Sequence, residues 1–226
     1  MKYDVITLFP EIINSYCTQS ITKRGIESGI IDVKTYNPRD YSLDKHKRVD
    51  DTPYGGGDGM VLACQPIFDC YGAIEKKDNF EFIMLTPQGE RFEQKTAVEL
   101  SKKEQIILLC GHYEGFDERI RLGLKPREIS IGDYVLTGGE LGALILIDSI
   151  SRNLENYLGK DKCASEDSFS NGLSGLLEYP HYTKPREFMG MKVPDVLLNG
   201  NHKEIEIYRK AQSFERTKTR RPDLLE

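Results

Sequence analysis

The sequence predicts an α/β protein, in which a parallel sheet is covered by helices on both faces. Segments rich in β-forming residues alternate with helical ones along the chain. The run from Ile106 to Cys110 is continuously apolar, which is typical of a strand buried on both sides. Polar, glycine-bearing loops at 85–92, 110–119 and 136–142 follow three predicted strands, and ligands of such sheets bind at the carboxyl ends of strands.

The first elements are indicated by β-formers and proline. Residues 2–8 predict a strand, and Pro10 marks the beginning of a helix that continues through "EIINSYCTQSITKRGIESG". From Pro38 to Gly59 the pattern is lost in polar, glycine-rich sequence, so a long loop is predicted there. Further strands are predicted at 31–37, 80–86, 104–111 and 128–136, with a helix over 93–103.

A change of composition after Arg152 predicts a second, smaller domain. Residues 153–175 are polar and punctuated by Ser, Asn and Gly, which indicates a linker. Beyond them "VPDVLLNG" and "HKEIEIYRKAQSFERTKTRRPDLL" are helical in pattern. The predicted organisation is an α/β domain over 1–159, an interdomain linker over 160–177 and a small helical domain over 178–226.

Composition excludes several classes of protein. The 226 residues are 38% hydrophobic and 30% charged, as expected of a soluble globular protein. No apolar run approaches the roughly 18 residues of a membrane span, and the N-terminus does not resemble a signal peptide. The five cysteines lack CxxC spacing and the four histidines are scattered, which argues against a disulfide framework or a structural zinc site. We therefore expect a reducing, cytoplasmic location.

Charge alone leaves two readings of the C-terminal segment. The net charge is −5, yet residues 209–221 hold six basic residues and a single acid. Such a segment is typical of an element that contacts phosphates. It is equally typical of an ordinary helix face exposed to solvent.

The glycine pair Gly138-Gly139 raises the question of a nucleotide cofactor. No GxGxxG or Gly-Lys-Ser/Thr motif is present, and the glycines of "YGGGDGM" have the wrong spacing and follow no strand. A nicotinamide or nucleoside-triphosphate enzyme is therefore not indicated. Gly132 and the pair instead allow the backbone to bend around a flat ligand. The helix predicted over 141–150 is apolar on nearly every side, so it should be buried in a core or an interface.

A series of motifs resembles one family along almost the whole chain. They are "DVITLFPE", "DDTPYGGGDGM", "LTPQGERF", "LLCGHYEGFDERI", "EISIGDYVLTGGELGALILIDSISR", "EDSF" and the run from "PHYTKPREFMG" to "RRPDLL". In this order they are similar to the bacterial tRNA (guanine-N(1)-)-methyltransferases of the TrmD family. The resemblance implies a SPOUT-type parallel sheet with a deep C-terminal trefoil knot, followed by a small helical domain. It also implies a homodimer with active sites at its interface.

The resemblance implies a reaction as well. The family methylates N(1) of the guanine at position 37 of tRNA when a guanine precedes it, using S-adenosylmethionine, and so preserves the reading frame. In "EDSF" the family's general base corresponds to Asp167, and the arginine that stabilises guanine O6 corresponds to Arg152. From the residues alone, Asp167 could be an ordinary linker carboxylate or a helix N-cap instead of a base. Arg152 could be a cation that interacts with the dipole at a helix C-terminus.

The remaining site residues come from the same match. Tyr113, Tyr134 and Glu114 would, taken singly, be ordinary packing or surface residues. The cofactor-binding residues implied are Pro87, Gly111, Tyr113, Glu114, Ile131, Gly132, Asp133, Tyr134, Val135, Leu136, Gly138 and Gly139. The tRNA-binding residues implied are Asp50, Arg216, Arg220 and Arg221. The family also suggests Mg²⁺ assistance in turnover, although no carboxylate cluster in the sequence indicates a metal site.

Two departures from the family pattern lie near predicted RNA contacts. Asp58 replaces a small residue or proline in the glycine loop, and "LSG" at 173–175 is similar to a three-residue insertion.

Two other functions stay open. One is a SPOUT-type enzyme acting on another RNA, against which the match of the C-terminal segment argues. The other is an RNA-binding module without activity, which the presence of both Arg152 and Asp167 disfavours.

Overall fold

The computed structural model describes residues 1–159 and 167–225, and the chain divides into two compact units, Met1–Gly159 and Lys160–Glu226. Of the segment predicted as a linker, 160–177, the first part, 160–166, lies outside the described residues. No helix in the described parts of the chain is long and apolar enough to cross a membrane.

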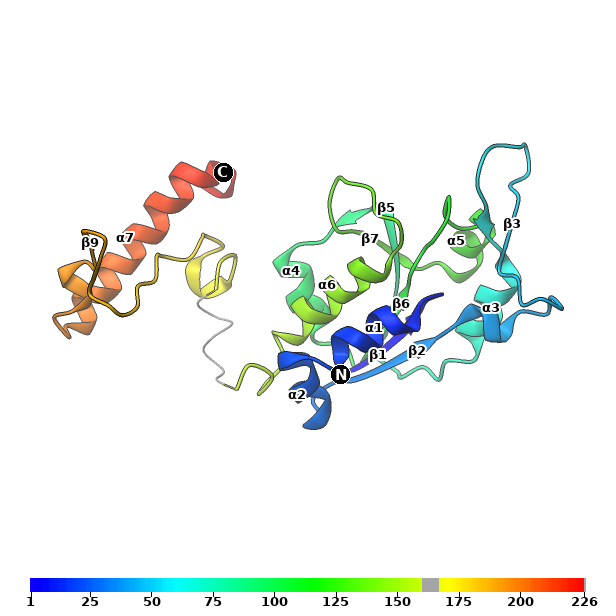
Figure 1. Cartoon of the computed structure of the whole chain (residues 1–226), viewed down its shortest axis with the longest axis horizontal. Helices are drawn as coiled ribbons and strands as arrows, with labels where there is room; N and C mark the ends of the chain where they lie inside the picture. Colours follow the sequence, from blue (N-terminus) through cyan, green and yellow to red (C-terminus); the bar gives the residue numbers. More distant parts are fainter. Residues whose placement is uncertain (160–166, 226) are drawn as a thin grey trace. The chain divides into compact units, whose positions relative to one another are not determined.

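A five-stranded sheet forms the centre of the first unit (Figure 1). Its neighbouring strands are all parallel, which confirms the predicted α/β class. In spatial order the strands are β2 (Asp32–Tyr36), β1 (Lys2–Ile6), β6 (Gln105–Leu109), β5 (Phe80–Arg91) and β7 (Arg127–Ser130).

Alternate residues of the central strands enter two separate hydrophobic cores. Ile106 and Leu108 of β6 belong to one core, and Ile107 and Leu109 belong to the other. This period of two is what a strand buried on both faces requires. The first core is covered by α1 (Pro10–Cys17), α2 (Ser20–Glu27), α4 (Gln94–Leu100) and α6 (Glu140–Ser151), and the second by η1 (Pro38–Tyr41), α3 (Cys64–Gly72) and α5 (Glu118–Leu124).

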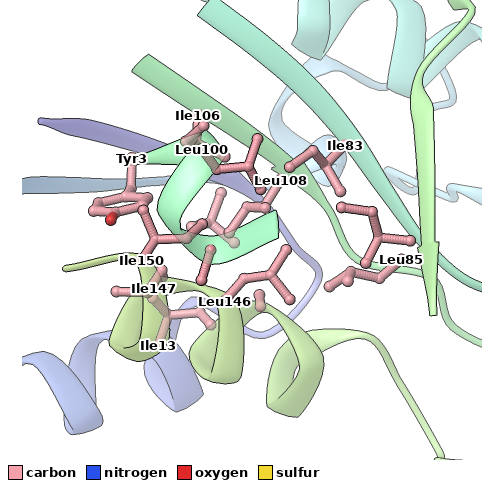
Figure 2. Close-up of a cluster of buried hydrophobic side chains, with 14 of the residues drawn as sticks. Tyr3, Ile13, Ile83, Leu85, Leu100, Ile106, Leu108, Leu146, Ile147 and Ile150 are labelled. Atoms are coloured by element: carbon pink, nitrogen blue, oxygen red, sulfur yellow. The ribbon is translucent and has the colours of Figure 1, made fainter. Parts of the chain in front are cut away.

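Helix α6 is the main element of the first core (Figure 2). Its Leu146, Ile147 and Ile150 are fully buried, and Figure 2 shows them with Ile13 of α1 below the strand residues. Burial of each such side chain contributes about 1.5–3 kcal/mol to folding. The opposite side of α6 carries Leu141, which is 55% exposed in this chain.

Three elements differ from the sequence predictions. The helix predicted after Pro10 is divided into α1 and α2, because the chain turns at Ser20 with φ +49°. The strand predicted over 128–136 ends at Ser130, because Gly132 adopts φ +143° and turns the chain away from the sheet. The long loop predicted before Gly59 contains η1 and β3 (Asp50–Asp51), which pairs with β4 (Val61–Leu62).

Strand β5 is longer than the predicted 80–86 and contains an irregularity. Ile129 of β7 pairs both with Leu85 and with Glu90, so the residues 86–89 between them bulge out of the ladder. These residues include Pro87, which cannot donate a hydrogen bond to the sheet. The bulge places four residues at the carboxyl edge of the sheet, beside the ends of β6 and β7.

The second unit is built around α7 (His202–Arg220). The Asn201 side chain caps this helix by accepting from the backbone N–H groups of Lys203 and Glu204. The helix predicted over "VPDVLLNG" is only a 3₁₀ turn, η3 (Asp195–Leu197), and the short hairpin of β8 (Glu187–Phe188) and β9 (Met191–Lys192) was not predicted. The other short turns are η2 (Asn171–Leu173) and η4 (Pro222–Leu225).

Candidate active site

A cavity of about 460 Å³ opens at the carboxyl edge of the sheet, between the loops that follow β6 and β7 and the bulge in β5. Its size is within the range of small-molecule sites. All residues predicted to bind the cofactor line it except Asp133. The predicted cofactor-binding residues that line the cavity are Pro87, Gly111, Tyr113, Glu114, Ile131, Gly132, Tyr134, Val135, Leu136, Gly138 and Gly139.

The loop after β6 forms one wall of the cavity. Gly139 donates its backbone N–H to the carbonyl of Gly111 at 2.9 Å, which joins this loop to the beginning of α6. Tyr113 has φ +59°, an uncommon conformation for a bulky residue, and its side chain is 46% exposed. Glu114 is exposed and has no ion-pair partner in the described parts of the chain. The wall therefore presents a carboxylate that an electropositive ligand group can pair with.

Residues 131–138 form the opposite wall, where strand had been predicted. The turn at Gly132 is closed by a hydrogen bond from Tyr134 N–H to the Gly132 carbonyl at 3.0 Å. The Tyr134 hydroxyl donates to the Ile131 carbonyl at 3.2 Å, and Val135 is 90% exposed. Apolar side chains and backbone polar groups thus alternate along this wall, which is the combination that an adenine ring needs for stacking and edge recognition.

A buried chain of hydrogen bonds, missed in the sequence, supports both walls. The Thr7 hydroxyl donates to Glu140 Oε1 at 2.6 Å, and Glu140 Oε2 lies 2.9 Å from His112 Nε2. The Glu140 side chain is only 3% exposed and stands at the first turn of α6, where the helix dipole favours a carboxylate. His112 lines the cavity and packs on the ring of Phe9 at 4.7 Å.

The sequence held a weak signal for this network. Thr7, His112 and Glu140 each lie within three residues of the end of a strand or at the beginning of a helix, as functional groups in such folds often do. Nothing in their spacing along the chain, however, predicts that they meet.

Cys110, immediately before the loop, is fully buried. Burial, reinforced by the nearby charge of Glu140, raises the pKa of its thiol well above its ordinary value. The group therefore stays a neutral thiol at neutral pH, and a thiolate nucleophile is not supplied here. Cys17, Cys64, Cys70 and Cys110 are all free in the described residues.

The two predicted catalytic residues belong to different units. Arg152 is the C-cap residue of α6 in the first unit, and its side chain is half-buried. Asp167 is the first described residue of the second unit, and its carbonyl accepts the N–H of Ser170 at 3.1 Å. Neither residue is without an interaction partner.

The three residues that resemble an insertion are contained in a local turn. Ser174 and Gly175 adopt positive φ, and Gly175 N–H donates to the Ser170 carbonyl at 2.9 Å. Phe169 N–H then donates to the carbonyl of Leu176 at 2.9 Å, which closes the turn. Residues 173–175 therefore lie inside the turn that this hydrogen bond closes.

The predicted tRNA-binding residues are distributed over both units. Asp50 lies in β3, half-buried, and Asp58 lies in the exposed glycine loop between β3 and β4. Arg216 and Arg220 line a hollow of the second unit. Arg221 does not line it, because its guanidinium pairs with Asp223 at 2.6 Å. No group of three His, Cys, Asp or Glu side chains suited to a metal occurs among the described residues.

Comparison with known proteins identifies one family over the whole chain. The family model of tRNA (Guanine-1)-methyltransferase TrmD matches residues 1–226. A tRNA (guanine-N(1)-)-methyltransferase of Clostridioides difficile (strain 630) is 56% identical over 227 residues, which cover 99% of this chain and 97% of the relative. Relatives of the same name are 55% identical in Halalkalibacterium halodurans, over 100% of this chain and 92% of the relative, and 52% identical in Carboxydothermus hydrogenoformans, over 100% and 87%. A match of this extent and identity shows that the chain belongs to the TrmD family of tRNA (guanine-1)-methyltransferases.

Proposed function

We propose that this protein transfers the methyl group of S-adenosylmethionine to N(1) of the guanine at position 37 of tRNA, a modification that preserves the reading frame. Membership of the TrmD family supports the methyl transfer to guanine. The observation that carries the cofactor assignment is the cavity at the strand ends, which is lined by Pro87, the loop after Gly111 and residues 131–139.

The residues of the cavity fit an adenosyl sulfonium compound. Backbone groups of the turn at Gly132 and apolar side chains such as Val135 suit the adenine ring. The carboxylate of Glu114, which has no ion-pair partner among residues 1–159 and 167–225, suits a positively charged portion of the molecule. A Cβ at Gly138 would lie too close to the ends of the His112 and Glu140 side chains, so both would have to shift. When bound, the cofactor would supply a methyl group on a sulfonium sulfur, whose remainder after the loss of that methyl is a neutral thioether.

The protein's part in the chemistry is proton removal and positioning. Guanine N(1) carries a proton whose pKa lies well above neutrality, so a base must remove it as the new N–CH₃ bond forms. Asp167 takes this proton on a carboxylate oxygen. The electron pair of the N–H bond then serves the bond to the methyl group. Negative charge that develops on guanine O6 is stabilised by the guanidinium of Arg152.

A homodimer is part of this proposal. The side of α6 that faces away from the core exposes Leu141 and Ile145, at 55% and 43%. On the adjoining α1, Ile12 and Tyr16 are exposed at 42% and 37%, and the Tyr16 hydroxyl donates to Asp148 of α6. We call these four apolar side chains the α1–α6 surface. Exposed apolar side chains on two packed helices suit an interface with a second copy of the chain. In this proposal the active sites lie at that interface.

The knot and assistance by Mg²⁺ belong to the proposal through the family resemblance, and the cytoplasmic location through the cysteine usage of the sequence. Assays with and without EDTA, followed by Mg²⁺ addition, test the metal. Restored turnover is expected, and an unchanged rate in EDTA would remove Mg²⁺ from the reaction.

The decisive experiment uses labelled S-adenosylmethionine with four tRNA transcripts that carry guanine or adenine at positions 36 and 37. Methylation of N(1) is expected only when both positions hold guanine. Methylation of ribosomal RNA but of none of these transcripts would instead identify an enzyme for another RNA. Binding of tRNA without any methyl transfer would identify a binding module.

A further inference from the structure

The glycine loop between β3 and β4 meets the wall of the cavity at its last glycine. A Cβ added at Gly59 would lie 2.6 Å from Cγ and 2.8 Å from Oε1 of Glu114, a residue that lines the cavity. We propose that Gly59 is a positioning residue: by lacking a side chain, it leaves the carboxylate of Glu114 where that group binds the α-ammonium group of S-adenosylmethionine. The inference rests on the proposed function, because it takes that compound as the occupant of the cavity.

The backbone around this contact is fixed by hydrogen bonds. Glu114 N–H donates to the Met60 carbonyl at 3.0 Å, and Leu62 N–H donates to the Gly115 carbonyl at 2.9 Å. Leu62 is only 1% exposed and belongs to a small hydrophobic core of its own. The end of the glycine loop and the wall of the cavity are thereby joined. A side chain at position 59 cannot be accommodated by separating the two backbones, so the Glu114 side chain has to move instead.

The tip of the same loop lacks such a contact. Gly55, Gly56 and Gly57 also adopt positive φ, but a Cβ at any of them would meet nothing within 4 Å. Gly56 has φ +82°, close to the +89° of Gly59. An alanine at either position therefore carries a similar backbone cost, and only the one at Gly59 displaces Glu114. The two glycines separate the conformational need for glycine in this loop from the need for space beside the cavity.

The chemistry of Glu114 favours the ammonium group over the sulfonium. The structure, over residues 1–159 and 167–225, gives its carboxylate no ion-pair partner. A carboxylate accepts hydrogen bonds, and an ammonium group offers three N–H donors, whereas a sulfonium offers none. Glu114 is also exposed, so it lies where the polar end of a ligand stays in contact with water. The amino-acid end of the cofactor is the portion that has both properties.

The test measures, by calorimetry, the affinity of the full-length protein for three compounds. They are S-adenosylmethionine, S-adenosylhomocysteine, which keeps the amino acid without the sulfonium, and methylthioadenosine, which lacks both. We expect Gly59→Ala to weaken binding of the first two about fivefold and to leave binding of methylthioadenosine unchanged. Gly56→Ala is the matched control and should leave all three affinities at wild-type values. Unchanged affinity for methylthioadenosine also shows that the variant is folded.

A cycle with Glu114→Ala shows whether Gly59 acts through Glu114. Glu114→Ala removes the three atoms nearest to the added Cβ and should by itself weaken binding of S-adenosylmethionine about fivefold. In that background Gly59→Ala should cost nothing further. Because the double variant has room for the new Cβ, this comparison stands even if Gly59→Ala alone does not fold. Losses that multiply in the double variant would overturn the positioning role.

Steady-state kinetics separates this role from contact of the loop with RNA. Gly59→Ala should raise KM for S-adenosylmethionine about fivefold, while kcat and KM for the tRNA transcript stay at wild-type values. A raised KM for tRNA with normal cofactor affinity would assign Gly59 to the RNA and overturn the proposal. A loss of affinity confined to S-adenosylmethionine would place Glu114 at the sulfonium and would overturn it as well.

The same measurements distinguish this inference from the proposed function. Equal affinities of the wild type and Gly59→Ala for all three compounds would reject the positioning role and leave the methyl transfer standing. Failure of the wild type to bind any of the three would reject the proposed cofactor, and the positioning role with it.

Discussion

His112 Nε2 lies 2.9 Å from Glu140 Oε2, and this contact joins the loop after β6 to the first turn of α6 beneath the cavity. The second oxygen of Glu140 accepts from Thr7 at the end of β1. Three separate segments therefore converge on one buried carboxylate. Because the loops before and after it form the cavity, its loss should be felt in cofactor binding as well as in stability.

Replacing Glu140 by Ala should weaken binding of S-adenosylmethionine about tenfold and lower the free energy of unfolding by about 1–3 kcal/mol, because two partners lose their acceptor. Calorimetric titration and urea denaturation measure the two effects. Thr7→Val is the control, since it removes the hydrogen bond to Glu140 and the one that Phe9 N–H donates to the Thr7 hydroxyl, and leaves the contact of Glu140 with His112. It should reduce stability with a smaller effect on binding. Wild-type cofactor affinity in Glu140→Ala would show that the network has no part in the site.

Substitution of Gly138 by Ala should weaken cofactor binding about tenfold, by displacing the network that Glu140 and His112 form. A Cβ at this position would collide with His112 and Glu140, so the turn and the buried network cannot both keep their positions. Gly72→Ala is the matched control, because a Cβ there meets nothing within 4 Å and the residue ends a helix. It should leave binding unchanged and alter stability by less than about 1 kcal/mol. Equal affinity in both variants, measured by calorimetry, would contradict the close packing at Gly138.

Substitutions at two isoleucines of α6 test the core and the proposed dimer interface independently. Ile147 is fully buried, so Ile147→Ala should lower the free energy of unfolding by about 2–5 kcal/mol in denaturant. Ile145 lies on the α1–α6 surface, and Ile145→Asp should shift the protein from dimer to monomer in sedimentation experiments while secondary structure is retained. A wild-type protein that sediments as a monomer at micromolar concentration would contradict the dimer.

The sequence predicted the sheet better than the walls of the site. Continuous apolar runs such as Ile106 to Cys110 identify strands buried on both faces. Strands β1 and β6 lie where the sequence predicted them. Residues 131–136 are rich in β-formers and were therefore predicted as strand. The unusual backbone at Gly132 overrides that local preference and makes a cavity wall instead.

The site residues were found by resemblance, and their contacts came from the structure. Spacing could not predict that Thr7, His112 and Glu140 share one network, because they are brought together only by the parallel order of strands in the sheet. The basic segment 209–221 was ambiguous as sequence. In the structure its cations differ in partners, so that Arg216 and Arg220 line the hollow while Arg221 is held by Asp223.

The proposed base is tested most directly by comparing methyl transfer in the wild type and Asp167→Asn, with a tRNA transcript carrying guanine at positions 36 and 37. Asparagine keeps the size of the side chain but cannot accept the N(1) proton. We predict that the single-turnover rate falls about 10²–10⁴-fold while affinities for tRNA and S-adenosylmethionine stay at wild-type values. Wild-type turnover by Asp167→Asn, with methylation still at N(1), would contradict the assignment of Asp167 as the general base.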